Sequence, residues 1–214
     1  MEELIVVYGM AILTIVGGYL FGSIPAGFLI GRIWGVDLLR SGSGRTGGTN
    51  VLRAAGLFPA LLTILSDAFK GLIPTYVAAG LFPAMPWVAA LTGAATVLGH
   101  NHSIFLKFRG GAGGVTALGA LGALSFPAAV VAAGVAIIAI VASRFASMAT
   151  FSGSVTGLLM LLILGLAHAN PFEYVIYGVI VVGLIGWSLR PNFVRIRAGT
   201  ERKIGAPEKN ITTV

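Results

Sequence analysis

The sequence contains no cysteine among its 214 residues. This absence excludes disulfide bonds, cysteine-ligated zinc and catalysis by a thiol. Charged residues are also scarce, at 10% of the chain, whereas soluble domains carry about 25%. Hydrophobic residues make up 57% of the chain, and the mean hydropathy is +0.95. Such a composition is typical of a protein that crosses a membrane several times.

Several signatures of catalysis are missing as well. The three histidines, His100, His102 and His168, are too few and too scattered to predict a metal site. There is no G-x-S-x-G nucleophile motif, and neither His100 nor His102 is followed five positions later by the aspartate of the His-x-x-x-x-Asp acyltransferases. We therefore expect no metal and no cofactor. A transfer reaction would depend on positioning and electrostatics, with a substrate that is already activated.

Seven apolar segments predict an all-α polytopic membrane protein with seven transmembrane or partly inserted helices. They form a single integral membrane domain, residues 1–214. Their approximate ranges are 4–33, 57–82, 87–98, 115–124, 127–142, 145–166 and 172–188. A full crossing needs about 20 helical residues, so the third and fourth segments are too short. The first segment is interrupted by Gly22-Ser-Ile-Pro25, where proline is expected to kink it.

The basic residues predict the orientation in the membrane. Thirteen of the fourteen lysines and arginines fall on one side of the predicted bundle, while Glu2, Glu3 and Glu173 lie near the other side. By the positive-inside rule, the N-terminus is outside and the C-terminus is cytoplasmic. Residues 34–53 and 99–114 are then cytoplasmic loops, and residues 190–214 a cytoplasmic tail. This topology accounts for the net charge of +7 without a nucleic-acid partner.

Two of the cytoplasmic loops have the composition of phosphate-binding loops. Residues 41–53 read SGSGRTGGTNVLR and contain both G-x-G-x-x-G and a P-loop pattern in which Gly48 replaces the lysine. Residues 99–116 read GHNHSIFLKFRGGAGGVT. Glycines let successive N–H groups face one anion, a following helix adds its dipole, and arginine binds phosphate oxygens with a planar fork. Together with the basic segment 190–205, these loops favour a phosphate site. The alternative is that the glycines serve helix packing and the arginines only topology.

Two charged residues lie inside the second predicted span. Asp67 and Lys70 are three positions apart and therefore share one helix face. Charges within a bilayer are costly and face each other or a cavity. We interpret the two residues as a structural ion pair, with a direct role in chemistry as the alternative. His100 is a candidate catalytic base, with capping of a helix end as its alternative role.

The order of several short motifs resembles one known family. The run Ser41-Gly-Ser-Gly, Gly47, Thr49-Asn50 and Arg53 is similar to the first signature of the PlsY family, the acyl-phosphate-dependent glycerol-3-phosphate acyltransferases of bacterial membranes. Further landmarks follow in the family's order over nearly the whole chain: Gly22-Ser-Ile-Pro25, Asp67 with Lys70-Gly71, Gly99-His100, Phe108 with Gly110-Gly111, Gly113, Thr116, and Ala198-Gly-Thr-Glu201.

This resemblance implies a reaction and a location. A fatty acyl group would move from acyl phosphate to the 1-hydroxyl of glycerol 3-phosphate, giving lysophosphatidic acid and phosphate, the first step of phospholipid synthesis. Acyl phosphate is a mixed anhydride, so no covalent acyl-enzyme is required. The expected partners are these two substrates and membrane lipid. The expected protein is a monomer in the bacterial inner membrane, with its active site facing the cytoplasm.

The composition of the loops and the resemblance together predict the site residues. Those expected in catalysis are Ser43, Arg53 and His100. Those expected to bind substrate or phosphate are Gly42, Gly44, Arg45, Thr49 and Asn50 in the first loop, Gly110, Gly111, Gly113 and Gly114 in the second, and Asn192 in the third.

The chain departs from the family pattern at five positions. The usual lysine of the second loop is Ala112, and the usual histidine and glutamate of the third signature are Leu189 and Pro191. The usual asparagine of the first loop is Arg45, and the usual proline of the second is Ser103. We hypothesise that Arg45 restores the positive charge that Ala112 lacks.

These departures keep two alternatives open beside the acyltransferase. One is a divergent paralogue that uses another phosphorylated substrate or is inactive. The other, from a different class, is an organophosphate transporter. Transporters often show internal repeats and charged residues along a pathway, but the sequence has no convincing repeat, and only Asp67 and Lys70 are charged residues in the middle of a predicted span.

Overall fold

The computed structural model describes residues 1–205, and within them the chain is helical without a β-strand. The elements are α1 (Glu2–Ser23), α2 (Ala26–Ile33), α3 (Gly48–Ala55), α4 (Leu57–Leu81), α5 (Pro86–Asn101), the short 3-10 helix η1 (Ile104–Leu106), α6 (Gly114–Leu124), α7 (Phe126–Ser143), α8 (Ala146–Leu166) and α9 (Tyr174–Arg197). The all-α prediction is confirmed. The end of the predicted cytoplasmic tail, with Lys209, lies outside the described residues.

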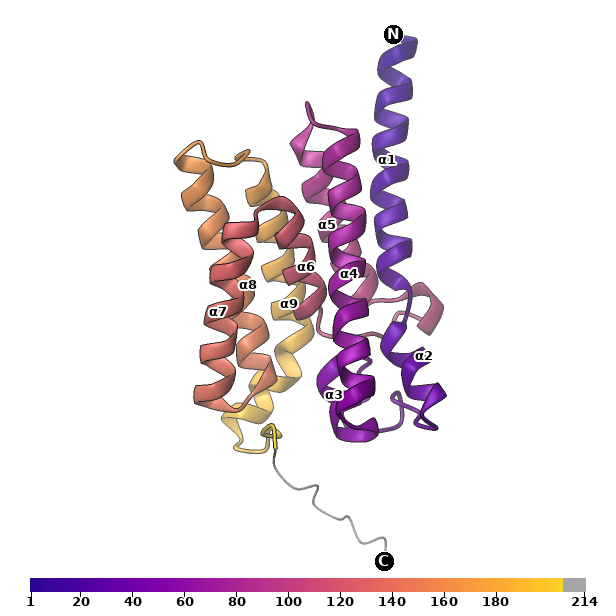
Figure 1. The fold of residues 1–214 in the computed structure, drawn as a ribbon, viewed down its shortest axis with the longest axis vertical. Coiled ribbons are helices and arrows are strands. Elements are labelled where there is room, and N and C mark those ends of the chain that lie inside the picture. Colours follow the sequence, from indigo (N-terminus) through magenta and orange to yellow (C-terminus); the bar gives the residue numbers. More distant parts are fainter. Residues whose placement is uncertain (206–214) are drawn as a thin grey trace, which may run out of the picture.

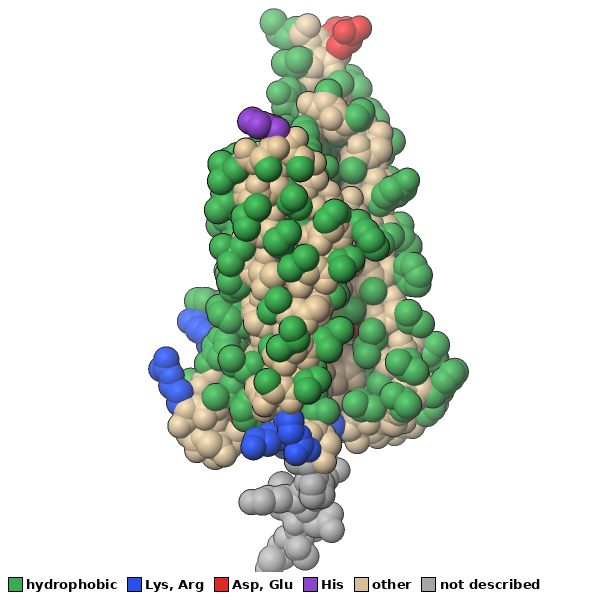
Figure 2. Space-filling view, turned by 60° about the vertical axis from the view of Figure 1, so that its left-hand side comes forward, with side chains coloured by type: hydrophobic (Ala, Val, Ile, Leu, Met, Phe, Trp, Pro, Cys, Tyr) green, Lys and Arg blue, Asp and Glu red, His purple; other side chains and the backbone are tan. Residues whose placement is uncertain are grey.

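The long helices run side by side along one axis, with α1 at the edge of the bundle (Figure 1). Five segments are long and apolar enough to cross a membrane: Glu2–Ile33, Leu57–Leu81, Phe126–Ser143, Ala146–Leu166 and Tyr174–Arg197. Helices α5 and α6 have only 16 and 11 residues, so the short length predicted for the third and fourth segments is confirmed. Figure 2 shows hydrophobic side chains around the middle, acidic side chains at one end and Lys and Arg toward the other.

The first apolar segment is divided at the predicted position. Helix α1 ends at Ser23 and α2 begins at Ala26, with Pro25 as the residue before α2. Proline has no N–H to continue the hydrogen-bond ladder, so the chain breaks there into two separate helices.

Glycines allow α4 and α6 to pack with their backbones in contact. A Cβ atom on Gly71 would overlap the carbonyl oxygen of Thr116, and one on Gly119 would overlap the carbonyl oxygen of Ala68. Close approach through small residues is the usual way in which membrane helices associate. This contact places the start of α6, which follows the second glycine-rich loop, directly against the charged part of α4.

We expect Gly71→Ala to lower the free energy of unfolding by about 1–3 kcal/mol, because the added Cβ forces two backbones apart. Gly80 lies in the same helix, and a Cβ there meets no atom within 4 Å. Gly80→Ala is therefore the matched control and should leave stability unchanged or raise it by up to about 1 kcal/mol. Denaturant unfolding in detergent measures both. Equal stability of the two variants would contradict this account of the α4–α6 contact.

The predicted cytoplasmic segments are more helical than expected. Gly48 already begins α3, residues 99–101 form the last turn of α5, and α9 continues to Arg197. The helix expected to end near Ser188 thus continues for nine more residues, while the cytoplasmic location of residues 190–214 stays a prediction. Pro191 lies inside α9, and such a proline is tolerated where neighbouring groups satisfy the freed carbonyls. Leu189, Pro191 and Asn192 thus belong to one continuous helix.

Candidate active site

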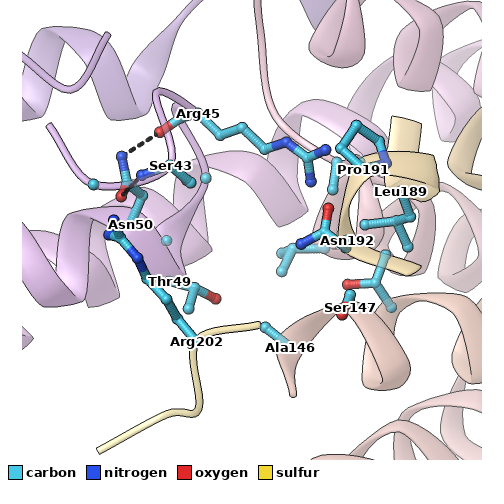
Figure 3. Close-up of a pocket in the computed structure, with 18 of the residues that line it drawn as sticks. Ser43, Arg45, Thr49, Asn50, Ala146, Ser147, Leu189, Pro191, Asn192 and Arg202 are labelled. Carbon is cyan, nitrogen blue, oxygen red and sulfur yellow. Dashed lines mark hydrogen bonds between the residues drawn. The ribbon is translucent and has the colours of Figure 1, made fainter. Parts of the chain in front are cut away.

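Helix α3 and the last turns of α9 lie at the same end of the bundle (Figure 1). A pocket of about 480 Å³ is found there (Figure 3). The three segments predicted from the sequence all contribute to it. The lining residues are Gly42, Ser43, Arg45, Gly47–Asn50, Arg53, Asp67, His100, Ala112–Val115, Ala146, Ser147, Thr150, Leu189, Pro191, Asn192, Arg195, Glu201 and Arg202. The prediction that the loops meet at one site is consistent with this geometry. Helix α8 also contributes, through Ala146, Ser147 and Thr150, which carried no motif in the sequence.

Asn50 organises the first loop. Its Oδ1 accepts a hydrogen bond from the Ser43 N–H at 3.0 Å, and its Nδ2 lies 2.8 Å from the Arg45 carbonyl and 3.0 Å from that of Ser41. The side chain is buried. Asn50 was expected to bind substrate, but its polar atoms are committed to the loop, so its role here is to hold Ser43 and Arg45 in place.

Two glycines allow this loop to turn, because Gly42 and Gly44 have φ of 61° and 69°, in the left-handed region. A Cβ on Gly42 would also overlap Oδ1 of Asn50. Gly42 lines the pocket, whereas Gly44 does not, so Gly44 shapes the loop without facing the site. Ser43 and Thr49 line the pocket, and among the described residues neither hydroxyl group has a hydrogen-bond partner. They remain candidates for contact with a substrate.

Arg45 crosses the pocket from the first loop to α9, where its guanidinium donates to the carbonyl of Ser188 (Figure 3). Burial, followed by the nearby charge of Arg195, lowers the pKa of Arg45 from its ordinary value, with Glu201 acting in the opposite direction. Burial and Arg202 lower the pKa of Arg53 in the same way. Both arginines thus lie in a positive environment that a bound anion would stabilise.

The glycines of the second loop form two pairs with different surroundings. Gly113, with φ of 82°, and Gly114 line the pocket at the N-terminus of α6, where a helix dipole favours an anion. Gly110 and Gly111, expected to bind phosphate, instead pack on His100: a Cβ on either would overlap that residue, and the Gly111 N–H donates to its carbonyl at 3.1 Å. Sequence reasoning could not separate the two pairs, because all four glycines lie in one run.

Ser103, which stands where the family has proline, gives this loop a hydrogen bond that proline cannot make. Its hydroxyl donates to the carbonyl of Ser23 at 2.6 Å, and the Tyr19 hydroxyl donates to the carbonyl of His102 at 3.0 Å. The second loop is therefore fixed to the last turn of α1.

The predicted ion pair is present and is part of a triad. Lys70 Nζ lies 2.8 Å from Oδ1 of Asp67, and Nδ1 of His100 lies 3.5 Å from the same oxygen. Lys70 also donates to the Ile24 carbonyl at 3.3 Å. All three side chains are buried, and Asp67 and His100 line the pocket. The triad thus connects the membrane-embedded part of α4 with the site.

Asn192 and Arg195 project from α9 and share one partner. Asn192 Nδ2 donates to Oε1 of Glu201, and Arg195 Nε donates to Oε2, both at 2.6 Å. Asn192 was predicted to be a site residue. Arg195 and Glu201 were not, although Glu201 belongs to the Ala198-Gly-Thr-Glu201 landmark.

An apolar cavity of about 270 Å³ adjoins the polar pocket and extends among α4, α6, α7, α8 and α9. The two share lining residues, namely Gly48, Thr49, Gly114, Val115, Ala146 and Thr150. The remaining wall is mostly aliphatic, with Leu118, Leu121 and Val181 among its residues. A molecule with an anionic head and a hydrocarbon chain matches this pair of cavities.

Known proteins with similar sequences and structures were found. A family model described as Glycerol-3-phosphate acyltransferase matches residues 12–199. The glycerol-3-phosphate acyltransferase of Thermus thermophilus is 42% identical over 195 residues, which cover 91% of this chain and 96% of that relative. That of Rubrobacter xylanophilus is 39% identical over 196 residues, covering 92% and 96%. The crystal structure of PlsY, an integral membrane glycerol 3-phosphate acyltransferase, in its glycerol 3-phosphate form matches with a TM-score of 0.86 and 34% identity, over 92% of this chain and 96% of that chain.

Proposed function

This chain belongs to the glycerol-3-phosphate acyltransferase family, and we propose that it transfers a fatty acyl group from acyl phosphate to the 1-hydroxyl of glycerol 3-phosphate. The products are lysophosphatidic acid and inorganic phosphate. The protein is an integral membrane acyltransferase, as is the PlsY whose structure it matches. The acyl-phosphate donor, the site on the cytoplasmic face of a bacterial inner membrane, and the monomeric state are parts of the proposal.

The observation that carries this proposal is the shared wall of the polar pocket and the apolar cavity. Acyl phosphate joins a hydrocarbon chain to a phosphate through one anhydride bond. With its chain among α6, α7 and α8, its reactive carbonyl would lie near Thr49 and Thr150, where the two spaces meet. Glycerol 3-phosphate is a polar dianion and suits the basic pocket. The pocket is formed within one chain, which supports a monomer as the working unit.

The proposed chemistry needs no covalent acyl-enzyme. The 1-hydroxyl oxygen attacks the acyl carbonyl carbon, the bond from that carbon to the phosphate oxygen breaks, and phosphate leaves with the electron pair. His100 accepts the hydroxyl proton, and Asp67, 3.5 Å from its Nδ1, orients the ring. Arg45, Arg53 and the N-terminus of α6 hold phosphate oxygens and stabilise the charge that develops during transfer.

The similarity to known proteins separates the acyltransferase from the transporter considered as its alternative. Relatives at 39–42% identity over nearly the whole chain are glycerol-3-phosphate acyltransferases by name, which disfavours an organophosphate transporter. An inactive paralogue is distinguished by measuring turnover.

The test is product formation by the purified protein in lipid, given acyl phosphate with and without glycerol 3-phosphate. We expect acceptor-dependent lysophosphatidic acid together with equimolar phosphate. Arg53→Ala should lower the rate about a hundredfold, because a donor to developing charge is lost. Absence of acceptor-dependent product from folded protein that still binds glycerol 3-phosphate would overturn the proposal and point to an altered paralogue.

A further inference from the structure

The segment that follows α9, residues 198–205, is held beside the site by contacts with α3, with the turn between α7 and α8, and with α9 itself. We name it the strap. The Arg53 guanidinium donates to the Arg202 carbonyl at 3.2 Å, which connects the strap with α3. The Arg144 guanidinium donates to the Ile204 carbonyl at 2.9 Å, and the Ile204 N–H donates to the Arg144 carbonyl at 2.8 Å, which connects it with the turn between α7 and α8. The strap therefore has a defined path along the pocket.

Glu201 is the residue of the strap that reaches the pocket. Its side chain is 9% exposed, and both carboxylate oxygens are used, one by Asn192 and one by Arg195. A buried carboxylate beside a basic, anion-binding pocket would repel the substrate if it were unpaired. Its two short charge-assisted hydrogen bonds offset the cost of burial and restrain both partners strongly.

The chemistry of these bonds determines which end of the Asn192 amide faces the pocket. An ionised carboxylate only accepts hydrogen bonds, so it must face the amide nitrogen of Asn192. The amide oxygen, Oδ1 of Asn192, then faces the pocket. It is buried and has no hydrogen-bond partner among the described residues. Figure 3 shows the Asn192 side chain directed into the space between Arg45 and Ser147. A buried, unpaired acceptor at this place suits a hydroxyl donor better than a phosphate.

Resting on the function proposed above, we propose that Glu201 is a positioning residue that fixes Asn192 with its amide oxygen toward a hydroxyl of the glycerol 3-phosphate acceptor. Arg45 and Arg53 then bind the phosphate of that substrate, and the amide oxygen of Asn192 accepts a hydrogen bond from a hydroxyl group at its other end. Glu201 acts through Asn192 and does not itself touch substrate. Its removal should therefore affect the acceptor far more than the donor.

The test compares Glu201→Ala with wild type in steady-state kinetics with both substrates. We expect kcat/KM for glycerol 3-phosphate to fall about tenfold to a hundredfold, as for the loss of one or two charge-assisted hydrogen bonds. Most of the fall should lie in KM for the acceptor, and KM for acyl phosphate should change less than threefold. Glu201→Gln should recover part of the loss, because its amide oxygen still accepts from Asn192. Glu173→Ala, at the other end of α9 and exposed, is the matched control.

A double-mutant cycle separates positioning from a general structural role. In the Asn192→Ala background, Glu201→Ala should lower kcat/KM for glycerol 3-phosphate by less than a further threefold, because the residue through which Glu201 acts is gone. A full additive loss in that background, or equal effects on donor and acceptor, would overturn the inference. If the wild type shows no turnover, the function proposed above fails separately. The same cycle, measured as calorimetric affinity for glycerol 3-phosphate, then decides the role of Glu201: non-additive losses support it and additive losses refute it.

Discussion

Replacing Arg45 with asparagine is expected to lower kcat/KM by about a hundredfold or more. Arg45 crosses the pocket and lies near the positive charge of Arg195, where a bound phosphate would stabilise it. Loss of one charged hydrogen bond costs about 1.5–3 kcal/mol, and loss of a donor to the developing charge costs about a hundredfold or more in rate. Arg40→Asn is the matched control, since Arg40 is 89% exposed in the same loop and pairs with Asp37. The measurement is lysophosphatidic acid formation.

Ala112→Lys should restore part of the activity that Arg45→Asn removes. Ala112 lines the same pocket as Arg45, so a lysine there returns a positive charge to the site from the opposite loop. The rescue should be incomplete, because an ammonium lacks the planar fork of guanidinium. If Arg45→Asn keeps wild-type activity and Ala112→Lys changes nothing, the idea that Arg45 compensates for Ala112 is wrong.

Asp67→Leu is expected to destabilise the protein by about 3–5 kcal/mol, because it leaves the ammonium of Lys70 buried without its counter-charge. The double variant Asp67→Leu with Lys70→Met removes both charges and should recover most of that stability. Unfolding in detergent measures the effect, with Glu3→Gln at the exposed end of α1 as the control. Equal stability of Asp67→Leu and wild type would contradict the buried pair.

Activity of the stable double variant then distinguishes the two roles considered for Asp67. If Asp67 orients His100 as a proton acceptor, the double variant folds but turns over at least about a hundredfold more slowly, the scale of general acid–base catalysis. If the pair only connects helices, activity returns together with stability. The second result would remove Asp67 from the proposed chemistry while leaving His100 and the phosphate-binding part intact.

The amino-acid sequence by itself determined the long helices and the three segments that line the pocket. Long apolar runs bounded by prolines and charges correspond to α4, α7 and α8, because helix length and hydrophobicity are local properties that the bilayer demands. The break at Pro25 and the turns at Gly42 and Gly44 are local as well, since each depends on the backbone preference of one residue. The pairing of Asp67 with Lys70 followed from helical spacing over three residues.

Only the tertiary structure decided which polar groups of the site are hydrogen-bonded within the protein and which remain available to a substrate. Asn50 was expected to bind substrate, yet its partners lie up to twelve residues away and the fold directs them onto its amide. Gly111 packs on His100, while Gly113 in the same run faces the pocket. Glu201 meets Asn192 and Arg195 because α9 continues through Pro191 and the strap then turns back. These contacts depend on three-dimensional packing between segments, which spacing along the chain does not encode.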